Sequence, residues 1–138
     1  MTRTQLLYLT VLLLFFGACD YYDHRLQIQN NSDHEITYFT SIDTIMDIDQ
    51  LNINHIDVYI GKKIVPGVTI NSTKIGSTQA WPFFIRKSVN EKLNIFFFSV
   101  DTLLKYNDWG IIKKLNLYEM YSFTEEELEQ SNWLIDYP

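Results

Sequence analysis

The stretch LNIFFFSV, residues 93–100, is the clearest strand signal in the chain. Successive side chains of a strand point to opposite faces of the sheet. One face would carry Leu93, Ile95 and Phe97, and the other Phe96, Phe98 and Val100. A strand that is apolar on both faces is typical of the centre of a sheet that is covered on both sides. The sequence therefore predicts a β-rich fold built around residues 93–100.

Shorter segments with β-type patterns are expected to surround this strand. Residues 25–29 alternate polar and apolar side chains, and residues 35–40 are rich in β-branched and aromatic types. Because the polar cluster NNSD at 30–33 favours a turn, these two segments are predicted to pair as a hairpin. Further strands are predicted at residues 55–60, 64–65, 68–70 and 111–122.

Short helices are predicted at three places. Residues 80–89 can place their apolar side chains on one helical face. Asp101 is expected to cap a helix at 102–106, and Thr124 begins a capping-box pattern ahead of a helix at 125–130. The apolar C-terminal residues 133–138 are expected to dock on the body of the domain.

The order of these segments favours a mainly β fold. Strands do not alternate regularly with helices, so a doubly wound parallel sheet is not expected. We expect an antiparallel β-sandwich-like domain with two or three short helices. The alternative is an α+β fold with a single antiparallel sheet and helices on one face.

The N-terminal stretch has the pattern of an export signal. A polar start with Arg3 is followed by an apolar run at 6–16, and then by the small residues Gly17 and Ala18 and by Cys19. As a helix, this run would reach only about 16 Å, roughly half of a hydrocarbon core, so a permanent transmembrane helix is not favoured.

The sequence Phe16-Gly17-Ala18-Cys19 resembles the lipobox of bacterial lipoprotein precursors. The resemblance implies that Cys19 carries a thioether-linked diacylglycerol and becomes the first residue after cleavage. Two or more acyl chains anchor a protein stably in a membrane. The alternatives are an ordinary secretory signal with an incidental cysteine, or a short membrane anchor.

This interpretation divides the chain into a signal peptide at 1–18, a lipidated cysteine with its tether at 19–24, and a single globular β-rich domain at 25–138. The acids that follow Cys19, Asp20 and Asp23, resemble the surface-export signals of Bacteroidetes lipoproteins. In enteric bacteria, an Asp directly after the cysteine instead resembles a signal for retention in the inner membrane. We expect an exported protein anchored in the outer membrane, with the periplasmic and the surface face both open.

Charge and cysteine content exclude several classes of function. Without residues 1–18, the chain keeps 10 Lys and Arg against 17 Asp and Glu, a formal charge of −7. That charge argues against nucleic acid as a partner, and it favours attachment through the lipid rather than through a basic patch. Cys19 is the single cysteine, which excludes an internal disulfide and a CxxC site. No cofactor is expected.

A wider resemblance covers most of the part that follows Cys19. The lipobox, the NNSD segment, the IFFFSVDTL segment and the ending SFTEEELEQSNWLIDYP resemble small uncharacterised lipoproteins of Bacteroides and its relatives. In the C-terminal pattern of that group, the matching pairs here are Glu127-Leu128, Asn132-Trp133 and Tyr137-Pro138. The resemblance implies export and anchoring, and it implies no particular activity.

Candidate catalytic and metal sites are weak. On a strand, His55 and Asp57 would share a face, but a metal site needs at least a third ligand. The acids Asp43, Asp47 and Asp49 lack the pattern of an EF-hand, so we expect a solvated loop and no metal site. The chain has no G-x-S-x-G motif, and we do not expect an enzyme.

Trp81, Trp109 and Trp133 are the candidate ligand-binding residues, because each lies at a predicted element boundary beside polar residues. Exposed indoles could stack on sugar rings, whereas buried ones would serve packing. The leading hypothesis is a lipid-anchored, non-enzymatic interaction or structural domain of the cell envelope, with an envelope protein or a glycan as possible partner. The alternatives are a glycan- or ligand-binding accessory lipoprotein and a small hydrolase.

Overall fold

The strand predicted at 93–100 forms β4, Leu93–Ser99, and lies in the centre of a three-stranded sheet. In this computed structural model, which describes residues 21–47, 49, 51 and 55–138, β4 pairs antiparallel with β2, Ile36–Ser41, and with β5, Glu119–Phe123. Six of the seven residues of β4 are buried. The prediction of a central strand that is apolar on both faces is therefore confirmed.

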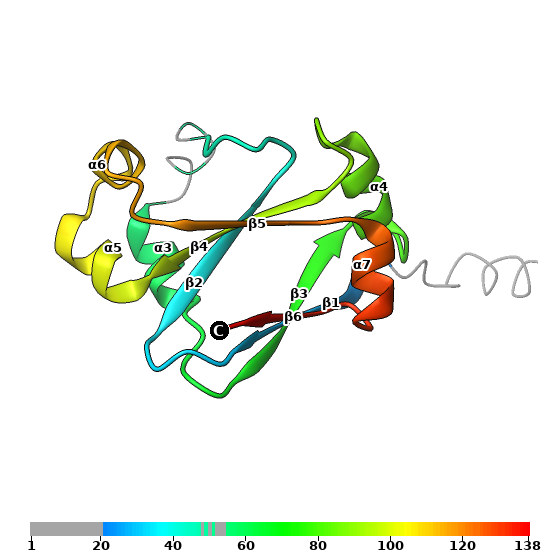
Figure 1. The fold of residues 1–138 in the computed structure, drawn as a ribbon, viewed down its shortest axis with the longest axis horizontal. Coiled ribbons are helices and arrows are strands. Elements are labelled where there is room, and N and C mark those ends of the chain that lie inside the picture. Colours follow the sequence, from blue (N-terminus) through cyan, green and yellow to red (C-terminus); the bar gives the residue numbers. More distant parts are fainter. Residues whose placement is uncertain (1–20, 48, 50, 52–54) are drawn as a thin grey trace, which may run out of the picture.

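A second three-stranded sheet is centred on β1, Tyr22–Asn30. Its antiparallel partner is β3, Thr69–Ile75, and its parallel partner is the C-terminal strand β6, Leu134–Tyr137. Figure 1 shows β6 beside β1, so that the last strand of the chain lies against the first one. The predicted docking of the C-terminal residues is confirmed, whereas a purely antiparallel arrangement is wrong because β6 runs parallel to β1.

The predicted hairpin of residues 25–29 and 35–40 is wrong, because β1 and β2 belong to different sheets. The turn itself forms around Asn30, whose buried side chain donates hydrogen bonds to the carbonyl oxygens of His34 and Ile64, each at 2.8 Å. The polar cluster thus predicts the turn correctly. It does not determine which strands pair, and β2 pairs instead with β4, which is apolar on both faces.

Two segments predicted as strands contain helices instead. Residues 56–61 form α3, Ile56–Gly61, and the first part of the predicted 111–122 strand lies in α6, Trp109–Lys114. In each helix the buried side chains are three residues apart, which suits a helical face rather than a strand. α6 is also capped by Asp108, whose side chain accepts a hydrogen bond from the backbone N–H of Ile111 at 2.9 Å.

The three predicted helices are present as α4, Ala80–Lys87, α5, Val100–Tyr106, and α7, Glu125–Gln130. The capping box that begins at Thr124 is also confirmed. The predicted cap of α5 is wrong, because Ser99 occupies the N-cap position and Asp101 lies in the first turn. With α3 and α6, the described residues contain five helices of six to eight residues, more than the two or three expected.

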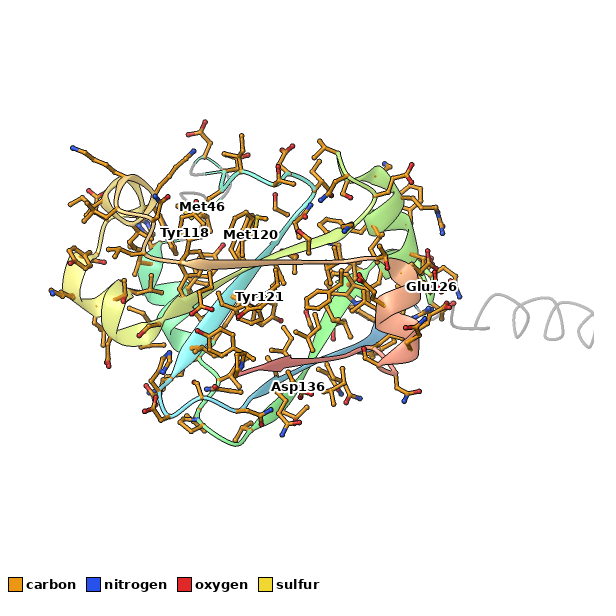
Figure 2. The ribbon with its side chains drawn as sticks, viewed as in Figure 1. Met46, Tyr118, Met120, Tyr121, Glu126 and Asp136 are labelled. Atoms are coloured by element: carbon orange, nitrogen blue, oxygen red, sulfur yellow. The ribbon has the colours of Figure 1, made fainter. Side chains whose placement is uncertain are left out.

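Buried side chains form two apolar clusters. The first contains residues of both sheets, among them Leu26 and Ile135 from one sheet and Ile95 and Phe97 from the other. The second lies under helices α3, α5 and α6; Met46 belongs to it, and the partly buried Tyr118 packs against it (Figure 2). The chain is thus a β-rich fold of two sheets with short helices, and the alternative of a single sheet is wrong.

The N-terminal boundary of the fold lies earlier than the sequence predicts. β1 begins at Tyr22, inside the segment assigned to the tether, and Asp23 is already buried. The apolar run at 6–16 and Cys19 lie outside the described residues. Among the residues that the structure describes, no helix is long and apolar enough to cross a membrane.

Candidate functional site

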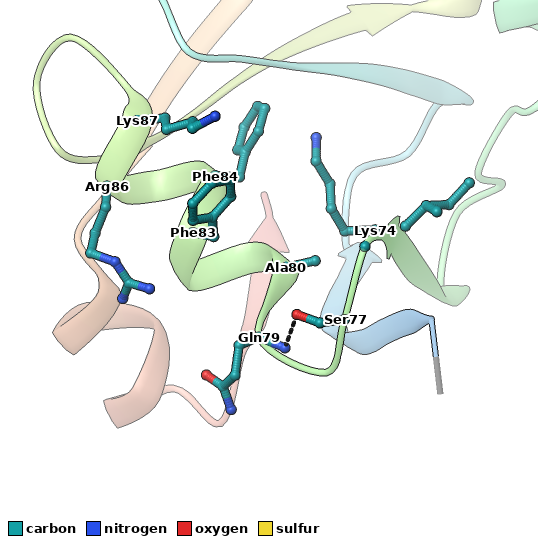
Figure 3. A pocket seen from close by; sticks show the side chains of 10 residues that line it. Lys74, Ser77, Gln79, Ala80, Phe83, Phe84, Arg86 and Lys87 are labelled. Atoms are coloured by element: carbon teal, nitrogen blue, oxygen red, sulfur yellow. Dashed lines mark hydrogen bonds between the residues drawn. The ribbon is translucent and has the colours of Figure 1, made fainter. Parts of the chain in front are cut away.

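A groove between β3 and α4 gathers cationic and aromatic side chains (Figure 3). It encloses about 590 Å³. None of the residues that line it is acidic. We call it the Lys74 groove, and its larger side chains are those of Lys74, Ile75, Phe83, Phe84, Arg86 and Lys87.

The turn between β3 and α4, residues 76–79, is fixed to the rest of the fold by a buried carboxylate. Asp23 accepts hydrogen bonds from the backbone N–H of Trp81 at 3.0 Å and from Nε of Arg25 at 2.9 Å. The guanidinium group of Arg25 also donates to the carbonyl oxygen of Thr78. These contacts hold the start of α4 against β1. Gly76 begins the turn with a φ of 140°, a conformation that side-chain-bearing residues rarely adopt.

The ammonium group of Lys74 is partly withdrawn from water inside the groove. Its Nζ lies 3.3 Å from the centroid of the Phe84 ring and 5.1 Å from that of Trp81. No ion pair to Lys74 occurs among the described residues. Burial without a countercharge lowers the pKa of Lys74 to about 8. The groove therefore holds a cation that an anionic ligand would stabilise.

The rim of the groove combines apolar surface with further positive charge. Ile75 and Phe83 are 75% and 55% exposed. Nζ of Lys87 lies 4.4 Å from the Phe83 ring centroid, and Arg86 is partly neutralised by Glu125 at 3.5 Å. Figure 3 shows Phe83 and Phe84 on the helical side and Lys74 on the strand side. An occupant with an anionic group and an apolar part would fit this arrangement.

The chain matches no protein-family model, no curated protein and no solved structure. What the groove can bind follows from its own side chains.

The three candidate tryptophans are buried, so their indoles contribute to packing and do not form an exposed surface for stacking on a sugar ring. Trp81, Trp109 and Trp133 are exposed to only 1%, 4% and 7%. The indole of Trp81 donates to the carbonyl oxygen of Ser72 at 3.2 Å, and that of Trp109 packs edge-on against Tyr59 and Phe98. An element boundary in the sequence shows that polar residues are near, but it does not show on which side of the backbone the ring lies.

The other candidate residues do not assemble into a catalytic or metal site. His55 and Asp57 lie at the start of α3, so they do not share the face of a strand. Asp43, Asp47 and Asp49 line a shallow hollow together with Lys113. Among the described residues, no group of three His, Cys, Asp or Glu side chains could hold a metal ion.

Sequence analysis missed the Lys74 groove because it ends the predicted strand at residue 70 and assigns no element to the polar residues 71–79. The structure continues β3 to Ile75, which places Lys74 on the strand opposite α4. The available signal was the sequence FFIRK at 83–87, where two aromatic residues precede two cations on one predicted helix. That signal predicts an amphipathic helix, but it does not identify the lysine from another strand that completes the site.

Proposed function

We propose that this chain is a lipid-anchored lipoprotein of the bacterial cell envelope, with a folded part that serves as a non-enzymatic interaction domain. The observation that carries the proposal is the position of Cys19, the single cysteine, directly after an apolar run and two small residues. The acyl chains on Cys19 would provide the attachment, and the proposed location is the outer membrane.

Two features of the fold support this role: the short segment between Cys19 and β1, and the apolar cluster that both sheets share. β1 begins only three residues after Cys19, so an anchored domain would lie close to the membrane surface. We also propose that the two sheets pack face to face as a sandwich-like body. The apolar cluster shared by both sheets and the hydrogen bond from the Tyr38 hydroxyl to Ser72 Oγ, at 2.8 Å, support that packing.

The glycan-binding alternative loses its stated basis, because the three indoles on which it rested are buried. A ligand-binding role is instead favoured by the Lys74 groove, where a partly buried cation that forms no ion pair with the described residues lies beside exposed aromatic surface. Its cationic lining would select an anionic occupant.

The anchor can be tested by following a labelled fatty acid into the full chain expressed in a bacterium. The wild-type chain and a Thr10→Ser control, altered inside the apolar run, are expected to incorporate the label. The Cys19→Ser chain is expected to incorporate none, because it lacks the sulfur that forms the thioether. Label in the Cys19→Ser chain, or no label in the wild-type chain, would overturn the proposal.

A further inference from the structure

The Lys74 groove lies beside the point where the folded domain begins. The backbone N–H of Gly76 donates to the carbonyl oxygen of Tyr21 at 2.7 Å, and Tyr22 pairs with Ile75 at the end of β3. Cys19 precedes Tyr21 by two residues, which span at most about 7 Å of extended chain. An anchor on Cys19 would therefore bring this end of the molecule to the membrane surface.

The surface at this end has two components that suit a phospholipid. The ammonium groups of Lys74 and Lys87 can bind a phosphate, because both lie in a groove whose lining residues include no carboxylate. The exposed side chains of Ile75 and Phe83 can contact the glycerol and the upper acyl region. Cations beside apolar side chains are typical of surfaces that bind at the membrane interface.

Acidic groups near the groove are engaged elsewhere or lie outside its lining. Asp23 is buried and bonded to Arg25 and to the backbone of Trp81. Glu125 pairs with Arg86, and Figure 2 places Glu126 on α7. No residue of α7 lines the groove. The chain as a whole is negatively charged, so an anionic membrane surface would repel most of it and attract the cationic groove. This difference would orient the molecule with the groove toward the membrane.

We infer that the Lys74 groove holds the phosphate headgroup of an anionic phospholipid in the membrane where Cys19 anchors the chain. The end that carries β3 and α4 then rests on the bilayer, and α5 and α6 point away from it (Figure 1). This inference rests on the proposed function, since the anchor supplies the membrane. The occupant is a lipid of that bilayer and not free phosphate, because the exposed apolar rim has no counterpart in an inorganic ion.

The test places a fluorescent label at either end of the full chain reconstituted in vesicles. Thr78→Cys lies in the exposed turn beside the groove, and Leu104→Cys lies on the exposed face of α5. In an acylated chain the sulfur of Cys19 is blocked, and for an unacylated chain the same labels are used in a Cys19→Ser background. The vesicles contain phosphatidylcholine alone, or an equal mixture with phosphatidylglycerol, and both include a quencher-bearing lipid.

The label at Thr78→Cys is expected to be quenched more strongly in the mixed vesicles, and the label at Leu104→Cys is expected to be unaffected by lipid composition. Lys74→Gln should lower the ratio of docked to undocked molecules about fivefold. The matched control is Lys105→Gln, which removes a lysine that also lies over a ring, 5.1 Å from that of Tyr106 but on α5. It should leave the ratio unchanged.

The outcomes separate the two proposals. Acylation of Cys19 without any effect of phosphatidylglycerol on the label at Thr78→Cys would overturn the lipid-binding groove and leave the anchor in place. Docking that depends on Lys74, together with a wild-type chain that incorporates no fatty acid, would support the groove and overturn the anchor. Equal losses in Lys74→Gln and Lys105→Gln would show attraction by total charge alone and would refute a specific role of the groove.

Discussion

Asp23 shows how one buried side chain positions the groove. The residue is 3% exposed, and its carboxylate contacts both Arg25 and the first turn of α4. A carboxylate removed from water costs free energy unless charged or N–H donors surround it, as they do here. Asp23 therefore links the central strand of one sheet, β1, to the helix that forms one wall of the Lys74 groove.

We expect Asp23→Ala to lower the free energy of unfolding by about 2–3 kcal/mol, because the hydrogen bonds of a charged acceptor are lost and the N–H of Trp81 is left buried without a partner. Asp33→Ala is the matched control, since the side chain of Asp33 is fully exposed and its loss should change stability little. Urea denaturation measures both variants. Equal effects of the two substitutions would contradict the structural role given to Asp23.

At the scale of elements, sequence patterns predicted the features that depend on interactions between residues close together in the chain. The capping box at Thr124 and the doubly apolar β4 are fixed by residues within a few positions of one another. α3 and α6 were predicted as strands because six residues of mixed polarity fit a period of two nearly as well as a helical period. Their packing against the second apolar cluster then decides the conformation.

Pairing between elements was not predictable from these patterns. β1 selects β3 and β6 as partners, the latter more than a hundred residues away, and nothing in the turn after Asn30 indicates this choice. The candidate site instead forms between consecutive elements, because Lys74 and Phe84 meet where the turn after β3 brings α4 back beside the strand. Tryptophans at element boundaries were conspicuous in the sequence, but packing buries them.

The capping box of α7 provides a prediction at this scale. Oγ1 of Thr124 accepts a hydrogen bond from the N–H of Glu127 at 3.1 Å, and the Glu127 carboxylate accepts one from the N–H of Thr124 at 2.7 Å. α7 has six residues and contributes the buried Leu128 to the core. We expect Thr124→Ala to cost about 1 kcal/mol in urea denaturation, and Thr124→Ser, which keeps the cap, to cost much less. A larger loss in the serine variant would contradict the role of the cap.

At the scale of the whole molecule, polar contacts connect the two sheets beside their shared apolar cluster. Tyr38 of β2 bonds to Ser72 of β3, and Tyr137 of β6 donates to Glu119 of β5 at 2.9 Å. The hydroxyl of Tyr121 donates to the other oxygen of the same carboxylate. Burial, and then the neighbouring Glu119 carboxylate, raises the pKa of Tyr137. Ionising Tyr137 would remove a donor and place two negative charges between the sheets.

This arrangement predicts a loss of stability in alkali. In the unfolded chain Tyr137 ionises near its usual pKa of about 10, whereas in the folded chain the raised pKa keeps it protonated. Unfolding therefore releases a proton above about pH 10, so the stabilisation is complete below that pH and is lost as the pH rises toward the folded-state pKa. Between about pH 9 and about pH 11, the free energy of unfolding from urea denaturation should fall more in the wild-type chain than in Tyr137→Phe. The free energy of unfolding of Tyr21→Phe, a substitution at an exposed position outside this cluster, should fall with pH as that of the wild-type chain does. If the free energy of unfolding of Tyr137→Phe fell as steeply as that of the wild-type chain, the contact between Tyr137 and Glu119 would not be the source of the pH dependence.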